Sequence, residues 1–336
     1  RWEFKTPIPF LRSREFLWQE GHTAHATKEE ADKEVMQILD LYEKVYQELL
    51  AIPVIKGKKT EKEKFAGALY TTSLEVFLPN GKAIQAATSH SLGQNFAKAF
   101  NIEFLDKNSK KQLVWQNSWG ITTRSLGILT MMHSDDKGFI MPPNIAHTQI
   151  VIIPILFDKT KEKIKKQCEK IKNELKDFSV EIDFREEYTP GWKFNEHELK
   201  GIPLRIEIGP RDLEKKQAVF VRRDTGEKTT VKLTEIKKRA GKTLGEIQDN
   251  LLNKARDFLK KNTVEANTFN EIEKALHNKK LVKAFWCQKP DCENKIRAQI
   301  ESAKIINVPF SQPKLIKNCA ICNKKALELV YIAKSY

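Results

Sequence analysis

Apolar residues recur at helical spacing in two long stretches of the chain. The first opens with a capping-box pattern at residues 27–30 and closes at Pro53; its apolar positions, three and four residues apart, are Val35, Leu39, Tyr42, Tyr46 and Leu49. The second spans residues 161–178, where the same spacing joins Ile164, Cys168, Ile171, Leu175 and Phe178. Each stretch predicts an amphipathic helix, and Cys168 is interpreted as a core residue. Shorter helices are expected at residues 93–100, 124–132 and 251–259.

Runs of strand length fill much of the remaining sequence. Before position 145 they cover residues 69–78, 83–88, 113–121 and 138–141, and after it residues 149–156, 179–185, 204–208 and 218–223. Asp224-Thr225-Gly226 has the composition of a hairpin turn leading into a strand at 229–233. The helix expected at 161–178 lies between two strands, which makes a βαβ pattern and favours a compact α/β module. The fold class expected is therefore α/β (α+β), with domains at residues 1–145, 146–233 and 234–336.

The composition excludes several classes of protein. Lysine and arginine outnumber aspartate and glutamate by 59 to 44 in 336 residues, a net charge of +15. This excess favours a polyanionic partner, although a solvated, lysine-rich surface explains it too. No apolar run approaches the roughly 18 residues of a membrane span, so no membrane partner is expected. Five cysteines are too few and too unevenly placed for a secreted disulfide scaffold.

Arginines dominate the candidate functional residues. Arg1 and Glu3 lie two positions apart, which puts them on the same face of a strand, and Arg12, Arg14 and Arg124 follow. A guanidinium group grips phosphate oxygens in pairs and keeps its charge, while a glutamate accepts a hydrogen bond from an exocyclic amine. The pattern suits a polyphosphate and an adenine held on an antiparallel sheet.

These arginines lie in segments that resemble motifs 2 and 3 of class II aminoacyl-tRNA synthetases. The amino-acid sequence of these segments resembles prolyl-tRNA synthetases of the archaeal and eukaryotic, cytoplasmic type more closely still, and the resemblance covers essentially the whole chain. It is carried by Arg1-Trp2-Glu3-Phe4, by Phe16-Leu17-Trp18-Gln19-Glu20-Gly21-His22, by Ala83-Ile84-Gln85 with Thr88-Ser89-His90, by Leu92-Gly93-Gln94-Asn95-Phe96, by Ser118-Trp119-Gly120-Ile121-Thr122-Thr123-Arg124, by Met141-Pro142-Pro143, by Gly209-Pro210-Arg211-Asp212, by Arg222-Arg223-Asp224-Thr225-Gly226 and by Ser335-Tyr336.

The resemblance implies a fold and a reaction. The domains would be an antiparallel catalytic sheet, an α/β anticodon-binding domain and a small C-terminal zinc-type domain. The enzyme would be a proline–tRNA ligase of the cytoplasm, a homodimer that uses ATP and Mg²⁺. Proline would first form prolyl-adenylate, and the prolyl group would then pass to the 3′ end of tRNA. Neither step needs a protein nucleophile, because alignment and neutralisation of phosphate charge supply the acceleration.

The resemblance also assigns residues to the active site. Arg1 and Arg124 are the expected catalytic residues, as the arginines of motifs 2 and 3. The residues expected to contact ATP are Arg1, Glu3, Arg12, Phe16, Gln85, Thr88, Thr122 and Arg124. The proline pocket would use Arg1, Trp18, Glu20, His22, Phe65, His90 and Ser118, although a lone histidine is ordinarily a core or surface residue. For tRNA the candidates are Arg211, Asp212, Arg222 and Arg223, whose side chains could reach anticodon bases or phosphates.

Four cysteines near the C-terminus form two closely spaced pairs. Cys287 and Cys292 are separated by four residues, and Cys319 and Cys322 by two. Thiolates paired at this spacing suit tetrahedral zinc, whereas reduced cysteines packed as small apolar residues are the alternative. In the family such a metal is structural rather than catalytic, so Zn²⁺ is expected here as a structural ion.

Two parts of the family pattern are expected outside this sequence. A Thr-x-Glu strand that receives the proline nitrogen and motif 1, which builds the dimer interface, would both precede Arg1. The stretch between motifs 2 and 3 is also short, without room for the large editing insertion of bacterial enzymes. A non-catalytic tRNA-binding paralogue or fragment is the main alternative, and a sister enzyme for threonine or histidine is another.

Overall fold

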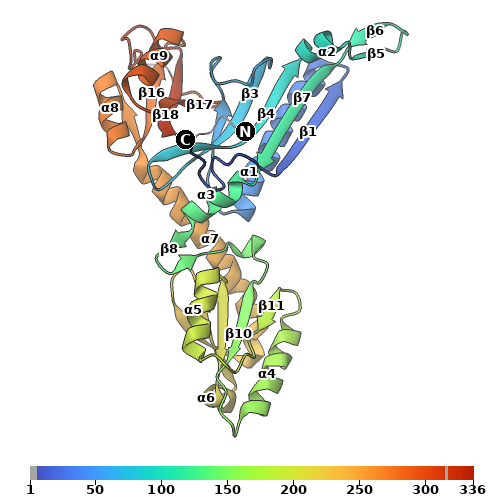
Figure 1. Ribbon diagram of the computed structural model, residues 1–336, viewed down its shortest axis with the longest axis vertical. Helices are drawn as coiled ribbons and strands as arrows, with labels where there is room; N and C mark the ends of the chain where they lie inside the picture. Colours follow the sequence, from blue (N-terminus) through green and yellow to red (C-terminus); the bar gives the residue numbers. More distant parts are fainter. Residues whose placement is uncertain (1–5, 315–316) are drawn as a thin grey trace. The chain divides into compact units, whose positions relative to one another are not determined.

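The computed structural model describes residues 6–314 and 317–336, and these form two compact units (Figure 1). The first unit contains the described residues up to Gln47 together with Ile52–Met132 and Arg256–Tyr336; the second contains Glu48–Ala51 and His133–Ala255. One long helix, α7 (Ile236–Asn262), contributes its last residues to the first unit and the others to the second. No helix in the described part of the chain combines the length and the apolar character needed to cross a membrane.

A nine-stranded sheet organises the first unit. Its order is β1 (Trp18–His25), β7 (Trp115–Thr122), β4 (Lys82–Gly93), β3 (Tyr70–Phe77), β2 (Ile55–Lys58), β17 (Ala303–Pro309), β18 (Glu328–Ser335), β16 (Leu281–Trp286) and β15 (Thr263–Ala266). Neighbours in this order run antiparallel except at the β15–β16 edge, which is parallel, and an additional short pairing of β18 with β4 is parallel too. The expected antiparallel sheet is therefore present, and strands from the last part of the chain extend it.

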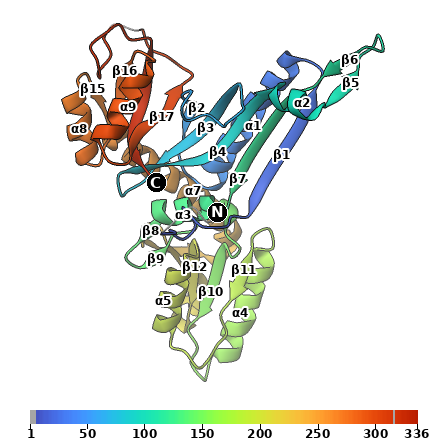
Figure 2. The ribbon, with the colours of Figure 1, turned by 45° about the horizontal axis from the view of Figure 1, so that its top comes forward.

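Helices pack on parts of this sheet. Helix α1 (Lys28–Lys44) packs on β4 and β7, as Figures 1 and 2 show, and continues into a π-helical turn (Val45–Leu49). The other helices are α2 (Asn95–Phe100), α3 (Arg124–Met132), α8 (Phe269–His277) and α9 (Pro290–Gln299). A hairpin of β5 (Glu103–Leu105) and β6 (Lys111–Leu113) projects beside α2 (Figure 2).

The start of α1 confirms the capping box expected from the sequence. The Thr27 hydroxyl accepts a hydrogen bond from the backbone N–H of Glu30, and the Glu30 carboxylate accepts one from the N–H of Thr27. The predicted apolar stripe is confirmed at Val35, Leu39 and Tyr46, which are completely buried, and at Tyr42, but it is wrong at Leu49, which is 41% exposed in the last, π-helical turn. Tyr46 donates from its hydroxyl to the carbonyl of Ala86 in β4, which ties the end of the helix to the sheet.

The second unit is built around a five-stranded mixed sheet. Its order is β11 (Val180–Ile182), β10 (Ile150–Pro154), β12 (Leu204–Ile208), β13 (Gln217–Arg222) and β14 (Lys228–Lys232), with the first three strands parallel and the last two antiparallel. Helices α4 (Lys161–Glu174), α5 (Pro190–Lys200) and α6 (Pro210–Glu214) belong to this unit, as do a 3-10 turn at Pro143–Ile145, another at Leu233–Glu235 and the small hairpin of β8 (Ser134–Asp135) and β9 (Gly138–Phe139). The βαβ arrangement and the hairpin at Asp224-Thr225-Gly226 agree with the sequence patterns.

Two helices differ from the sequence-based expectation. Helix α7 was expected only around residues 251–259 but begins at Ile236, and its buried residues continue the helical spacing upstream to Ala240 and Leu244. Helix α5 was not expected, because its inward positions are Lys193 and His197 rather than apolar residues. Asp183 is a partner of both side chains: its carbonyl accepts from Lys193 and its carboxylate lies 3.0 Å from His197 Nε2.

Candidate active site and thiol cluster

A cavity of about 420 Å³ lies against the face of the sheet formed by β1, β4 and β7; we call it the main pocket. Alternate residues of a strand point to the same face, and the register places such residues from all three strands together. His22 on β1 and His90 on β4 both pair with Ser118 on β7, while Glu20 and Thr88 both pair with Gly120. The lining residues are Trp18, Glu20, His22, Phe65, Gln85, Thr88, His90, Leu92, Phe96, Phe100, Ile102, Gln116, Ser118, Trp119 and Gly120.

Aromatic rings form one wall of the main pocket. The ring of Phe65 lies 5.0 Å from the His90 ring and 6.4 Å from the Phe96 ring, both in tilted arrangements. Phe65 comes from the connection between β2 and β3, whereas Phe96 belongs to α2. The pocket thus combines an apolar wall with the polar side chains of the strands, as is usual for small-molecule sites.

His90 is held as a neutral ring within this wall. Burial lowers its pKa from 6.5 to about 4. Its Nδ1 lies 2.9 Å from the Thr71 hydroxyl, which accepts a hydrogen bond from the backbone N–H of Phe65. With that hydroxyl proton directed to Nδ1, the neutral imidazole carries its own proton on Nε2; this tautomer is assigned from the hydrogen-bond network.

A smaller recess of about 110 Å³ adjoins the main pocket. The two share Trp18, Gln85, Thr88 and Gly120. We call the smaller one the adjoining recess, and its remaining lining residues are Phe16, Ala86, Ala87, Thr122 and Arg124. It therefore carries an arginine and an aromatic ring, the two groups that suit a nucleotide.

Arg124 is fixed in a defined orientation at the start of α3. Its Nε donates to the carbonyl of Leu11 at 2.8 Å and its Nη1 to the carbonyl of Gln85 at 3.3 Å. The guanidinium carbon lies 5.0 Å from the centre of the Phe16 ring, a cation–π geometry. The Arg124 backbone N–H donates to the Thr122 hydroxyl. A cation at the first turn of a helix, where the backbone dipole also favours negative charge, is suited to hold an anion.

The residues predicted for the active site fall into four groups in the structure. Arg1 and Glu3 lie outside the described residues. The predicted proline-pocket residues Trp18, Glu20, His22, Phe65, His90 and Ser118 all line the main pocket, and Phe16, Gln85, Thr88, Thr122 and Arg124 all line the adjoining recess. Arg12 lines neither cavity; its backbone pairs with Ile8, and the preceding Leu11 carbonyl is the one that holds Arg124.

The four cysteines near the C-terminus converge on one point. The Sγ atom of Cys287 lies 3.5 Å from that of Cys292 and 3.6 Å from that of Cys322, and the Sγ atoms of Cys292 and Cys319 are 4.0 Å apart. Four sulfurs about 2.3 Å from a tetrahedral zinc are separated by about 3.8 Å, so the cluster matches that geometry. Burial raises the pKa of Cys292 and of Cys319, whereas for Cys322 the opposing hydrogen bonds from the Lys324 backbone and the neighbouring thiols lower the pKa to about 7.

The residues predicted to touch tRNA mostly have partners inside the second unit. Arg223 is 7% exposed and donates to both carboxylate oxygens of Asp135, at 2.8 and 2.6 Å, as well as to the carbonyl of Glu198. This hydrogen-bonded pair lowers the pKa of Asp135 to about 2. Arg222 donates to Asp224, and Asp212 accepts from the backbone N–H of Gly209. Arg211 is the exposed member of the four.

An exposed aromatic pair in the same unit was missed by sequence reasoning. The rings of Tyr188 and Trp192 stack with their centres 3.9 Å apart, and the Arg185 guanidinium lies within 5.3 Å of both ring centres. Arg185 also donates to Asp183 and Glu196, which holds it against the rings. The sequence did contain a signal for this pair. Tyr188 and Trp192 are four positions apart at the start of α5, whose N-cap is Thr189, and a helix brings side chains at this spacing together.

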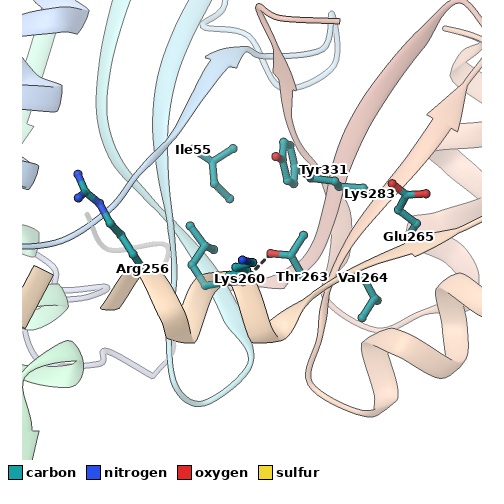
Figure 3. Close-up of a pocket in the computed structure, with 9 residues that line it drawn as sticks. Ile55, Arg256, Lys260, Thr263, Val264, Glu265, Lys283 and Tyr331 are labelled. Carbon is teal, nitrogen blue, oxygen red and sulfur yellow. Dashed lines mark hydrogen bonds between the residues drawn. The ribbon is translucent and has the colours of Figure 1, made fainter. Parts of the chain in front are cut away.

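A third cavity, of about 410 Å³, lies where the end of α7 meets β15, β16 and β18 (Figure 3). Arg256, Lys260 and Lys283 line it together with Glu265 and Tyr331, and the Lys283 ammonium lies over the Tyr331 ring at 5.5 Å. None of the predicted site residues lines this cavity. It is therefore a separate feature of the first unit.

Comparison with known proteins decides the family. Residues 1–133 match the tRNA synthetase class II core domain (G, H, P, S and T), residues 149–243 the anticodon binding domain, and residues 269–336 the prolyl-tRNA synthetase C-terminal domain. The whole chain is 46% identical to the cytoplasmic proline–tRNA ligase of Arabidopsis thaliana, of which it spans 65%. It is 48% identical to the proline–tRNA ligase of Lachnoclostridium phytofermentans and 46% identical to that of Natranaerobius thermophilus, and it spans 70% of each.

The chain belongs to the proline–tRNA ligase family. This confirms the family and the fold class expected from the sequence, and with them the enzyme class, an ATP-dependent ligase that joins proline to tRNA. The three domain boundaries and the residue assignments stay predictions. The alignment with the Lachnoclostridium enzyme spans 337 positions against 336 residues here, so that bacterial relative has no large insertion in this region either.

The low pKa of His90 predicts a pH-dependent contribution to stability. Unfolding restores the ordinary pKa of His90. The unfolded state therefore binds a proton at His90 below about pH 6.5, whereas the folded state binds it only below about pH 4. The parent protein should therefore lose thermal stability relative to a His90→Gln variant as the pH falls from 6.5 to 4. Above pH 7 the difference between their melting temperatures should be constant. A difference that stays constant over the whole range would contradict a neutral, buried His90.

Proposed function

We propose that the protein containing this chain activates proline with ATP in the main pocket and the adjoining recess, and then transfers the prolyl group to tRNA. The observation that carries this assignment is the junction of the two cavities, which share Trp18, Gln85, Thr88 and Gly120. A prolyl-adenylate needs an apolar site for a small ring joined directly to a site for a charged nucleotide. The membership in a family of proline–tRNA ligases supports the same substrates.

The main pocket suits the pyrrolidine ring of proline. Phe65 and Phe96 offer an apolar wall, and the neutral His90 avoids placing a charge against the ring. Trp18, Glu20, His22 and Ser118 complete the predicted set around it. Arg1, which the family pattern assigns to the substrate carboxylate and the α-phosphate, lies outside the described residues.

The adjoining recess suits the adenosine phosphate part. Phe16 offers a face for the adenine, and Arg124 offers a fixed cation for phosphate oxygens, with Mg²⁺ entering as the partner of ATP. A carboxylate oxygen of proline attacks the α-phosphorus and pyrophosphate leaves with the bond electrons. A terminal ribose hydroxyl of tRNA then attacks the acyl carbon, loses its proton, and releases AMP. The protein aligns these groups and neutralises phosphate charge, as catalysis without a protein nucleophile requires.

The thiol cluster is proposed to hold a structural zinc ion. The sulfur separations and the buried, four-thiol donor set support this assignment. Zinc favours the thiolate form of all four side chains and would cross-link β16 and the start of α9 to the 319–322 turn. The cluster lines neither active-site cavity, so no catalytic step is assigned to it.

The tRNA surface is proposed to include the aromatic pair of the second unit. Unstacked anticodon bases are commonly bound by stacking on aromatic rings and on arginine planes. Tyr188, Trp192 and Arg185 offer such a surface, and Arg211 is an exposed cation of the same unit. The name of the Arabidopsis relative supports a cytoplasmic location. The homodimer is proposed from the family resemblance alone, and sedimentation of the purified full protein would test it.

Replacing Arg124 tests the activity directly. In the full protein, Arg124→Ala should lower the rate of proline-dependent ATP–pyrophosphate exchange by about 10²–10³-fold, because a preorganised phosphate ligand is lost. Arg124→Lys should recover little, since an ammonium group cannot make the same paired contacts. Arg256→Ala, in the cavity of Figure 3, is the matched control and should leave exchange unchanged. If the parent protein binds tRNA but exchanges no pyrophosphate, the non-catalytic alternative is correct.

Metal analysis tests the thiol cluster. Elemental analysis of protein purified without chelators should find about one zinc per chain, and a Cys319→Ser/Cys322→Ser double variant should have lost it. Cys168→Ser is the control, because Cys168 is buried in the core of the second unit. Full zinc content in the double variant would show that the metal sits elsewhere.

Replacing Trp192 tests the anticodon surface. Trp192→Ala should weaken binding of proline tRNA by roughly 5- to 150-fold, the cost of about 1–3 kcal/mol for one lost stacking partner. Pyrophosphate exchange without tRNA should be unaffected. The control is Trp286→Phe, a buried change in the first unit. Equal tRNA affinity of the Trp192→Ala variant and the parent protein would remove the aromatic pair from the tRNA surface.

A further inference from the structure

The turn that leads to Phe65 is anchored by side chains from the last part of the chain. Glu63 forms ion pairs with Arg297 of α9 and with Lys304 of β17, the latter at 3.1 Å. The hydroxyl of Thr60 donates to the buried carboxylate of Glu293, also on α9, at 2.9 Å. We call Thr60, Glu63, Glu293, Arg297 and Lys304 the anchor. It joins residues more than 200 positions apart in the sequence.

Backbone contacts fix the base of the same turn. Strand β2 pairs with β17 through Lys58 with Val308 and Gly57 with Pro309, and Figure 2 shows the two strands side by side. A Cβ on Gly57 would lie 2.2 Å from the carbonyl oxygen of Val308, so only glycine permits this approach. The fully buried ammonium of Lys59 donates to the carbonyl of Ile306 at 2.9 Å and pairs with Glu75.

The anchored turn continues directly into the wall of the main pocket. The backbone N–H groups of Glu63 and Lys64 both donate to the carbonyl of Thr60, at 3.0 and 2.9 Å, which makes the turn compact. Phe65 follows at once, and its N–H donates to the Thr71 hydroxyl that also contacts His90. A displacement of Glu63 must therefore move the Phe65 ring relative to His90.

The other end of the anchor is joined to the thiol cluster. Glu293 directly follows Cys292 in the first turn of α9, and Arg297 lies one turn further along the same helix. The side chains of Glu293 and Glu63 are 3% and 14% exposed and that of Arg297 is 32% exposed, so the carboxylates of these contacts are largely shielded from water. Ion pairs with restricted solvent access hold a geometry more firmly than pairs on an open surface.

We propose that Glu293, Arg297 and Lys304 are positioning residues for proline binding: they hold the turn at residues 60–64 so that Phe65 closes the main pocket. The inference rests on the proposed function of that pocket. It assigns a role in substrate affinity to residues that touch neither proline nor ATP. It also makes the C-terminal segment a part of the amino-acid site rather than a separate stabilising module.

The test compares substrate constants in the full protein. Arg297→Ala and Glu63→Gln should each raise the KM for proline about tenfold in ATP–pyrophosphate exchange, as removal of one shielded ion-pair partner would. The KM for ATP should change less than about twofold, because the adjoining recess does not contact the turn. The double variant should raise the KM for proline by less than the product of the two single effects, since both changes break the Glu63–Arg297 pair. Hydrogen exchange at residues 60–68 should be faster in each variant.

A change on the same helix provides the control. Lys295→Ala removes a cation that lies over the Phe269 ring at 4.6 Å. Because Lys295 is two positions from both Glu293 and Arg297 on α9, it lies on another face of the helix, and both KM values should be unchanged. Unchanged KM for proline in Arg297→Ala and Glu63→Gln would overturn the proposal, as would parallel losses for proline and ATP with a lower melting temperature. An inactive parent protein would instead refute the proposed function, and the hydrogen-exchange comparison would still report whether the anchor holds the turn.

Discussion

The register between β1, β4 and β7 is the constraint on which the candidate site depends. His22 and His90 meet across Ser118, and Glu20 and Thr88 meet across Gly120. A shift of one residue in either pairing would turn these side chains to the opposite face of the sheet. Helix α1 packs against β4 and β7, which fixes both strands from behind. The apolar stripe of α1 therefore contributes to function indirectly, by holding the strands that carry the pocket.

Local patterns in the sequence were sufficient for most of the elements. The capping box at Thr27, the stripe of α4 and the hairpin at Asp224-Thr225-Gly226 each follow from neighbouring residues, and the structure contains all three. Helix α5 was not predicted, because Lys193 and His197 occupy positions on its buried side where apolar residues would be expected. Both are partnered by Asp183, which no local spacing reveals.

The family resemblance predicted which residues form the candidate site, whereas local sequence patterns could not. Gln85, Thr122 and Arg124 come from different elements, and only the fold joins them in one recess. The limits of this reasoning appear at charged residues. Arg223 looks like an RNA contact in the sequence, yet it is buried against Asp135, because the sequence does not show which cations find acidic partners. The contacts of Glu63 with α9 and β17 are equally invisible, since they span most of the chain.

A crystal structure of the full protein with a non-hydrolysable analogue of prolyl-adenylate tests the central claim most directly. The account predicts the pyrrolidine ring within about 4 Å of Phe65 and His90, the adenine against Phe16, and the group that replaces the phosphate beside Arg124. An analogue bound in the cavity lined by Lys260 and Lys283 would contradict this account, as would one that occupies only the main pocket or only the adjoining recess.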